Sequence, residues 1–313
     1  MVEVSNNPQS PAMTEDPRSR RGWRRGESVM RWLWWKIAVI GPAVVAAGAV
    51  WLVVLASVPA QWAPMAAAAV AFAVVVLAGG AGEGVAARVT MGSRGLNDEE
   101  ASSLRNVLVL LCREGIGPAV GDLRVRPGAA EVSAGGLGRG TVVLSAGLID
   151  GVRCGGLPAD QAAAVIGHAV LRVKAGCHRW DALLWLWLLP LRPLQLVWAV
   201  LVEVGSRVPG AQLLWKARAV VFCVAIANFL DLGEPGFAIL IGILGAASYV
   251  VPVARGRWEK ELAEIGDSGL ALGGLGTALI TFLRRCHQSP QTRARLVRLT
   301  SASVDVTGPA LAR

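Results

Sequence analysis

The chain has 313 residues, of which 54% are hydrophobic and 17% are charged, and its formal net charge is +9. This composition is too apolar for an ordinary soluble domain and predicts membrane-spanning segments. The basic excess does not indicate nucleic-acid binding, because many basic residues stand in one block between Arg18 and Lys36, directly before the first apolar segment. Such a block follows the positive-inside rule and predicts a cytoplasmic N-terminus.

Arginine is much commoner than lysine, and alanine, glycine and valine dominate the chain, which is typical of GC-rich bacterial genomes. We therefore predict a multi-pass protein of a bacterial plasma membrane whose N-terminus and soluble domain are cytoplasmic. Its first partner is the lipid bilayer, and no nucleic-acid partner is expected. The five cysteines show no C-x-x-C spacing, and reduced cytoplasmic thiols account for them.

The N-terminal part predicts a tail followed by a membrane hairpin. Residues 1–29 are polar and rich in Pro, Ser and Arg, which indicates a disordered basic cytoplasmic tail. Residues 30–81 predict two transmembrane spans, at 37–57 and 62–80. The first is apolar over the roughly 20 residues that a helix needs to cross a bilayer. Tryptophans near the ends of these apolar segments resemble an interfacial aromatic belt.

Residues 96–180 are more polar and predict the first part of a soluble cytoplasmic domain. Asn97 and Glu100 have the spacing of a capping box at the start of a helix. Segments 123–126 and 141–145 are short and β-prone, and the glycines between them predict a turn or loop. The buried face of the first helix is expected to comprise Leu104, Val107, Leu108 and Leu111.

Residues 182–253 predict further transmembrane or interfacial helices, broken near residue 190 and again at 231–235. The number of spans depends on whether residues 217–230 cross the membrane or lie at its surface. Basic residues after 253 favour a cytoplasmic end, so we expect four spans in the whole chain. Residues 255–299 then predict the second part of the soluble domain, and 300–313 a flexible tail.

Segment 157–176, LPADQAAAVIGHAVLRVKAG, predicts a helix with one apolar face. His168 and Arg172 lie four residues apart on another face. In H-E-x-x-H enzymes two histidines at this spacing bind zinc, and the glutamate beside the first activates water. Here Ala169 stands in place of the glutamate and Arg172 in place of the second histidine. The apolar face comprises Ala162, Val165, Ile166, Ala169, Val170 and Val173.

The order of these parts resembles the HtpX-like family of membrane zinc metallopeptidases, related to the CAAX prenyl proteases, over about residues 97–299. Segment 141–150, TVVLSAGLID, is similar to the family's edge strand and the turn before its zinc helix. Segments 264–283 and 287–299 are similar to its third-ligand region and its closing segment. The resemblance implies a mainly α membrane protein, with transmembrane helices and a cytoplasmic α+β zincin-like metallopeptidase-type domain.

The resemblance also implies that the catalytic positions are lost. His168 matches the first zinc ligand, whereas Ala169 occupies the position of the general base and Arg172 that of the second ligand. Catalytic zinc normally has three protein ligands and an open position for water. An arginine is always cationic and would repel the ion. We therefore expect no cofactor in this chain, although the family uses zinc, and no catalytic residue.

The third-ligand region gives no ligand in either register. If Asp267 matches the family's aspartate, Ala263 takes the ligand position, and if Glu264 matches it, Lys260 does. One hypothesis is that Arg172 replaces the charge of the metal and pairs with Glu264 or Asp267. The other is that Arg172 points into water.

The expected function is that of a catalytically inactive membrane protein that binds or regulates membrane or cytoplasmic proteins or extended peptides. A peptide would join the sheet by strand addition, which needs only backbone hydrogen bonds. The alternative is an active zinc metalloendopeptidase with rearranged ligands. A transport role ranks last, because the first two spans carry almost no polar residues. The expected peptide-binding edge strand comprises Thr141, Val142, Val143, Leu144 and Ser145.

Overall fold

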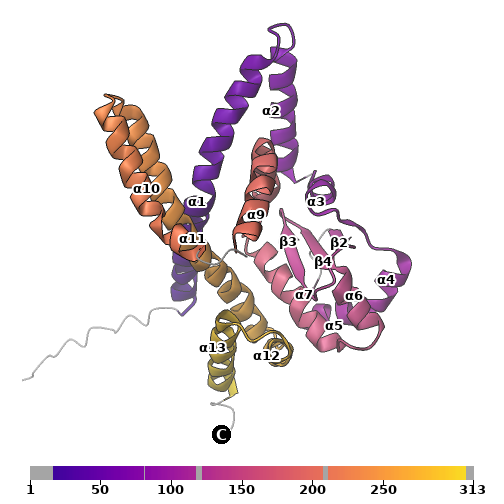
Figure 1. The fold of residues 1–313 in the computed structure, drawn as a ribbon. Helices are drawn as coiled ribbons and strands as arrows, with labels where there is room; N and C mark the ends of the chain where they lie inside the picture. The colour runs from indigo at the N-terminus through magenta and orange to yellow at the C-terminus, as the bar shows by residue number, and fades with distance from the viewer. Residues whose placement is uncertain (1–16, 81, 118–121, 207–210, 308–313) are drawn as a thin grey trace, which may run out of the picture.

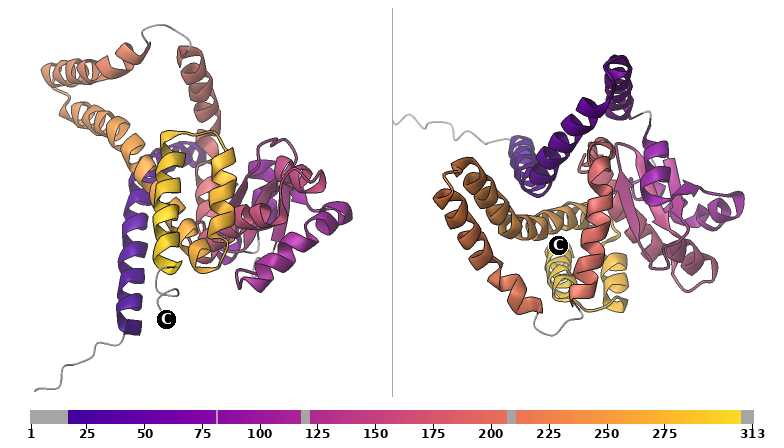
Figure 2. Two further views of the ribbon diagram at one scale, coloured as in Figure 1. Left: turned by 90° about the horizontal axis from the view of Figure 1, so that it is seen from below. Right: turned by 45° about the horizontal axis from the view of Figure 1, so that its top comes forward.

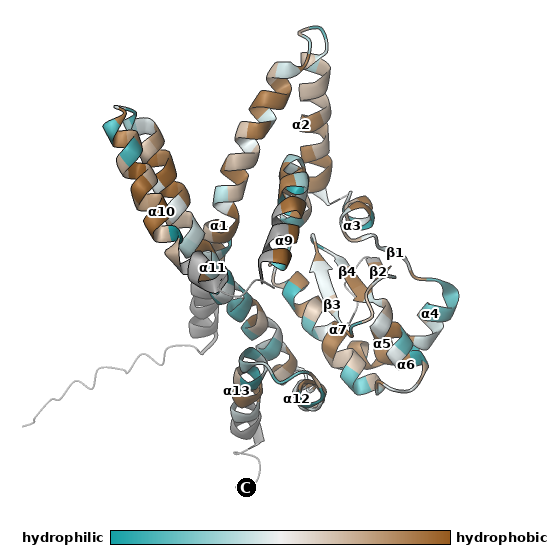
Figure 3. Ribbon diagram, in the orientation of Figure 1, coloured by the Kyte–Doolittle hydropathy of each residue, from teal (hydrophilic) through white to brown (hydrophobic). Residues whose placement is uncertain are grey.

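The computed structural model describes residues 17–80, 82–117, 122–206 and 211–307. The chain is mostly helical, with a small mixed sheet and two helices that are long and apolar enough to cross a membrane. Figure 1 shows these helices projecting away from a compact part that contains the sheet. The hydropathy colouring in Figure 3 follows this division, because the projecting helices are largely hydrophobic and the outer helices of the sheet part carry hydrophilic residues.

The first membrane helix, α1, spans Pro17–Ser57, and its segment Leu33–Ser57 is long and apolar enough to cross a membrane. This agrees with the predicted span at 37–57. The predicted disorder of residues 1–29 is wrong where the structure describes them, since α1 already begins at Pro17, and residues 1–16 lie outside the described residues. Extending an existing helix costs far less than starting one, so the apolar segment carries the helix into the basic residues before it.

The second arm of the hairpin is shorter than predicted. Helix α2 spans Ala63–Gly79 and has 17 residues, and α3 spans Glu83–Met91. The two helices meet the length and hydropathy of a membrane span only when taken together, and they are bent by 103°. Gly80, with φ 88°, ends α2, because a left-handed residue cannot continue the helix. The bend directs the chain from the hairpin toward the sheet (Figure 1).

The predicted span at 182–204 is broken. It consists of three elements: helix α8, a 3-10 turn η1, and the 15-residue helix α9. Prolines at 190 and 193 lack the backbone donors that an uninterrupted helix needs. The expected four spans are therefore a wrong prediction within the described residues, where two helices qualify, or three if α2 and α3 count as one. The bounds are Asp181–Trp187 for α8, Leu189–Leu191 for η1, and Arg192–Ser206 for α9.

The last long helix, α11, joins the apolar helices to the part that contains the sheet. It follows α10 (Ala211–Asp231) after a short turn and spans Pro235–Leu272 without a break. The predicted span at 236–253 is its first half. Pro252 does not end α11, which continues into the polar residues that follow. A proline in a membrane helix is tolerated when neighbouring helices support it, and α11 packs against both α1 and α10.

The sheet has four strands in the order β1-β2-β4-β3. Strands β2 and β4 are parallel, whereas β3 pairs antiparallel with β4 and β1 pairs antiparallel with β2. The β-prone segments 123–126 and 141–145 correspond to β2 and β4. The strands comprise β1 Arg94–Gly95, β2 Asp122–Arg126, β3 Ala134–Leu137 and β4 Thr141–Ser145.

The predicted edge strand is wrong, because β4 lies inside the sheet. Its two sides pair with β2 and β3, and all five of its residues are buried, so it offers no free backbone edge to a peptide. The edge is β3, a glycine-containing segment that was expected to be a loop. Gly136 lets β3 approach α7 closely, since a Cβ there would overlap Val173 and His178. The five residues of β4 are therefore core residues: Thr141, Val142, Val143, Leu144 and Ser145.

One hydrophobic core joins the sheet to the helices around it. The capping box at Asn97 and Glu100 is confirmed, with both reciprocal hydrogen bonds present. The apolar face of α7 is confirmed as well, because its predicted residues are all buried. Leu104, Val107 and Leu111 are buried and Leu108 is partly buried in the same core. The helices are α4 Asp98–Ser103, α5 Arg105–Arg113, α6 Ala146–Arg153 and α7 Ala159–Lys174.

The C-terminal helices complete this core. Helix α12 spans Gly276–Arg285 and α13 spans Pro290–Thr307, and α12 packs on α7 while α13 packs on α11 and α12. Figure 2 shows α12 and α13 lying together beside the sheet part. The expected flexible tail at 300–313 is helical as far as Thr307, and residues 308–313 lie outside the described residues. Helices α5 and α12, which are more than 100 residues apart in the sequence, therefore both pack against α7.

Candidate functional site

The meeting of α7 and α11 brings two predicted site residues together. His168 on α7 places its Nε2 atom 3.3 Å from Oδ1 of Asp267 on α11. Gly266, beside Asp267, makes this approach possible, because a Cβ there would overlap the imidazole ring of His168. Both side chains are largely withdrawn from solvent, with 12% and 9% of their area exposed.

Arg295 on α13 adds a guanidinium to this pair. Its Nε donates to Asp267 Oδ2 at 3.1 Å and its Nη2 donates to Oδ1 at 2.6 Å, which is the strong bidentate geometry of an arginine and a carboxylate. The same Nη2 lies 3.3 Å from His168 Nε2. We call His168, Asp267 and Arg295 the buried triad. One turn later on α13 and one turn earlier on α11, Arg298 forms a second ion pair with Glu264.

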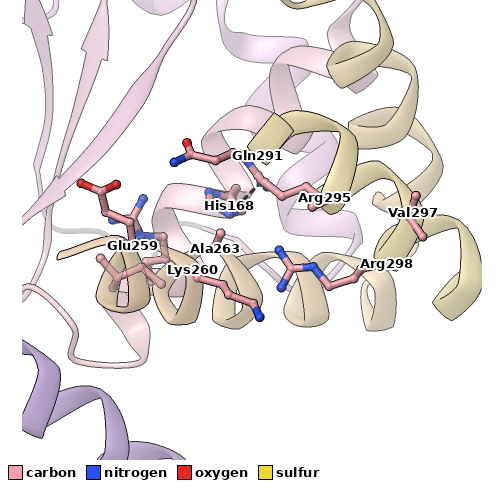
Figure 4. Close-up of a pocket in the computed structure, with 12 residues that line it drawn as sticks. His168, Glu259, Lys260, Ala263, Gln291, Arg295, Val297 and Arg298 are labelled. Atoms are coloured by element: carbon pink, nitrogen blue, oxygen red, sulfur yellow. Dashed lines mark hydrogen bonds between the residues drawn. The ribbon is translucent and has the colours of Figure 1, made fainter. Parts of the chain in front are cut away.

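A cavity of about 650 Å³ lies beside the buried triad, between α7, α11 and α13. Four of its lining residues are basic: Arg172, Lys260, Arg295 and Arg298. Glu259 is the acidic residue among those that line it. Figure 4 shows His168 and Arg295 on one side of this space, with Lys260 and Arg298 extending along α11 below them.

The hypothesis that Arg172 pairs with Glu264 or Asp267 finds no such ion pair among the described residues. Both carboxylates form ion pairs with the arginines of α13. The Nε atom of Arg172 is buried and has no hydrogen-bond partner among the described residues. Burial lowers the pKa of its guanidinium, because the charged form loses water. Arg172 is thus a partly desolvated cation that has no ion pair within the described residues, and not a residue that points freely into water.

Ala169 is 1% exposed and packs in the hydrophobic core, so the position expected for a general base lies outside the residues that line the cavity. The sequence analysis assigned no role to Arg295 and Arg298. Their spacing of three residues matches the spacing of Glu264 and Asp267, and this match is the signal that could have paired the two helices.

The residues around His168 do not fit a zinc ion. The donor set is one imidazole and one carboxylate, and the carboxylate already accepts two hydrogen bonds from Arg295. Two guanidinium groups, of Arg172 and Arg295, line the same space and would repel a divalent cation. Among the described residues, no three His, Cys, Asp or Glu side chains come together in a way that could hold a metal.

Comparisons with known proteins give no relative: no protein-family model, curated protein or solved structure matches this chain. The fold and the cavity therefore define the class of protein by themselves. It is a mainly helical, membrane-associated protein with a basic cavity where a long membrane helix enters a small α+β part.

Proposed function

We propose that this protein is a non-hydrolytic relative of the HtpX-like membrane metallopeptidases, retained as a binding or regulatory protein of a bacterial plasma membrane. The observation that carries the proposal is the buried triad. A guanidinium, from Arg295, lies against Asp267 and against His168, the one residue that matches a zinc ligand in the resemblance.

The chemistry of the triad supports binding over hydrolysis. Peptide hydrolysis by this route needs a water molecule activated by a metal and a carboxylate base. Ala169 supplies no base, and Asp267 is held as the partner of Arg295. The two hydrogen bonds from Arg295 draw negative charge away from the oxygens of Asp267, which also makes Asp267 a poor metal ligand. What remains is a cavity with hydrogen-bond donors on several sides.

The membrane orientation in the proposal rests on α1 and α11. The basic residues around Lys36 and those after Val253 follow the positive-inside rule, which favours a cytoplasmic location for the sheet part. Arg257 lies over the ring of Trp35, 4.9 Å from its centre, and joins the two helices near the ends of their apolar segments. In the zincin-like interpretation of this domain, strand addition of a peptide would use β3, which in the described chain pairs only with β4.

Zinc content tests the proposal directly. The full chain, purified in mild detergent, is expected to hold far less than one zinc per chain after dialysis against buffer containing zinc, and to leave casein uncut. His168→Ala should not change the zinc content, and His287→Ala, at an exposed histidine, is the matched control. One tightly held zinc that is lost in His168→Ala but kept in His287→Ala, together with casein cleavage, would establish the alternative of an active metallopeptidase with rearranged ligands.

A further inference from the structure

The cavity beside the buried triad has more positive charge than its carboxylates balance. Arg295 and Arg298 are neutralised by Asp267 and Glu264. Arg172 and Lys260 remain, and within the described residues neither forms an ion pair, while Glu259 is the acidic residue lining the space. An uncompensated cation removed from water is costly, and an anion that enters the cavity would remove this cost.

Arg172 is the group that most needs such a ligand. Its Nε atom is buried without a hydrogen-bond partner in the described part of the chain, although buried donors in native proteins are nearly always paired. Arg172 lines the cavity together with Arg295. Guanidinium groups bind the oxygens of phosphate and carboxylate groups through two parallel hydrogen bonds.

The position of the cavity along α11 indicates where the ligand comes from. Gly256 lines the cavity and lies three residues after Val253, the end of the apolar half of α11. Three residues of helix correspond to roughly 4–5 Å, so the cavity is at the depth of lipid headgroups if that half spans the membrane. Apolar residues also line it, among them Leu262, Ala263 and Val297.

We propose that this cavity binds a phosphate group, with Arg172 and Lys260 as the residues that provide the uncompensated positive charge. The phosphate belongs either to the headgroup of an anionic phospholipid or to a soluble phosphate compound. The proposal rests on the proposed function in one respect, namely that no metal fills the cavity. The buried triad then fixes α7, α11 and α13 around the ligand.

Ligand-dependent melting of the full chain tests this site. The protein in an uncharged maltoside detergent is titrated, at constant ionic strength, with short-chain phosphatidylglycerol, with phosphatidylcholine of the same chain length, or with sodium phosphate. Phosphatidylglycerol is expected to raise the melting temperature. Each charge-assisted hydrogen bond supplies a large part of the binding free energy at such a site. Arg172→Met and Lys260→Gln should therefore each raise the half-saturating concentration of phosphatidylglycerol roughly tenfold.

Arg293→Gln is the matched control, because it removes one positive charge from an exposed position of α13 that does not line the cavity. It should titrate like the unchanged protein. Phosphate ions also stabilise proteins in general by exclusion from their surfaces, so only a difference between variants counts. Lys260 is exposed, and Lys260→Gln therefore gives a result even if Arg172→Met does not fold.

The possible results distinguish the two sources of phosphate from each other, and the phosphate site from the proposed function. A variant-dependent response to phosphatidylglycerol alone supports a lipid headgroup, and such a response to sodium phosphate as well supports a soluble phosphate compound. Equal titrations of Lys260→Gln and Arg293→Gln overturn the phosphate site, whereas equal responses to the two lipids overturn the anionic headgroup as its source. Zinc that is lost in His168→Ala would overturn the proposed function and the phosphate site with it, whereas equal titrations of Lys260→Gln and Arg293→Gln in a zinc-free protein would overturn the phosphate site alone.

Discussion

Asp267 connects three helices through one carboxylate. It lies on α11, accepts two hydrogen bonds from Arg295 of α13, and contacts His168 of α7. A bidentate pair of this kind fixes both the distance and the orientation of the helices that carry it. Arg172, four residues after His168, is not part of this pair, and it remains a partly buried cation without a partner anion among the described residues.

The two arginines are expected to differ in their effect on stability. Arg295→Met leaves the largely buried carboxylate of Asp267 without its guanidinium and should lower the free energy of unfolding by about 3 kcal/mol. Arg172→Met removes a desolvated charge with no ion pair in the described chain, so it should leave stability unchanged or raise it. Urea unfolding followed by tryptophan fluorescence measures both, with the exposed Arg293→Met as control. A larger loss for Arg172→Met would instead support a pair between Arg172 and an acidic residue of α11.

At the scale of elements, the turn between β3 and β4 depends on α3. The carboxylate of Glu83, in the first turn of α3, accepts the backbone N–H of Arg139 at 2.6 Å and of Gly140 at 3.2 Å. Gly138 has φ 66° and its missing side chain leaves room for this carboxylate. The Arg139 side chain donates to the carbonyl of Ala78 in α2 at 2.6 Å. The turn is thus held to the C-terminal end of α2.

Removing the Glu83 carboxylate should loosen this turn. Glu83→Ala leaves two backbone donors without their acceptor, which is expected to cost about 2 kcal/mol in stability. Trypsin should then cut after Arg139 faster than in the unchanged protein. Glu131→Ala removes an exposed carboxylate of the same domain and is the control. Equal cleavage of the two variants would show that the sheet holds the turn without α3.

At the scale of the whole molecule, one buried ion pair joins α1 to the sheet part. Lys36 is 5% exposed, and its Nζ atom donates to Asp181 Oδ1 at 2.5 Å and to the carbonyl of Cys177 at 3.0 Å. His178 Nδ1 lies 2.7 Å from Asp181 Oδ2. These contacts fix the start of α8 against α1, and with Trp35 and Arg257 they hold the membrane helices in place on the domain.

Lowering the pH should weaken the contact between α1 and α8. Burial raises the pKa of Asp181, but the hydrogen bond with His178 and the charge of Lys36 lower it by more, so the net pKa lies below its usual value. A carboxylate with a lowered folded-state pKa stabilises the fold above the unfolded value, about 3.9, and loses this contribution as the pH falls through the folded-state pKa.

Melting curves of the unchanged protein and of Asp181→Asn between neutral and acidic pH measure this contribution. The variant should melt at a lower temperature at neutral pH, and the gap should close as the pH falls below the usual pKa of aspartate. Asp150→Asn, at an exposed aspartate, is the control and should show no such convergence. A gap that stays constant with pH would mean that the charge of Asp181 is not what holds α8 to α1.

Local patterns in the sequence determined much of the fold. Apolar periodicity defined the buried face of α7, β-propensity located β2 and β4, and Asn97 with Glu100 located the start of α4. Length and hydropathy identified the membrane segments of α1 and α11. These features depend on neighbouring residues, so they can be read along the chain.

Only the tertiary structure decided which residues form the site and which strand lies at the edge. Arg295 reaches Asp267 across 28 residues and His168 across 127, and β3 is a strand because β4 supplies its hydrogen bonds, in spite of its glycines. Periodicity and propensity carry no information about such distant partners. The sequence by itself therefore determined that α7 carries Ala169 and Arg172, and no glutamate or second histidine, after His168. The packing of α13 on α11 decided that arginines, one of them without an ion pair in the described chain, occupy the space beside His168.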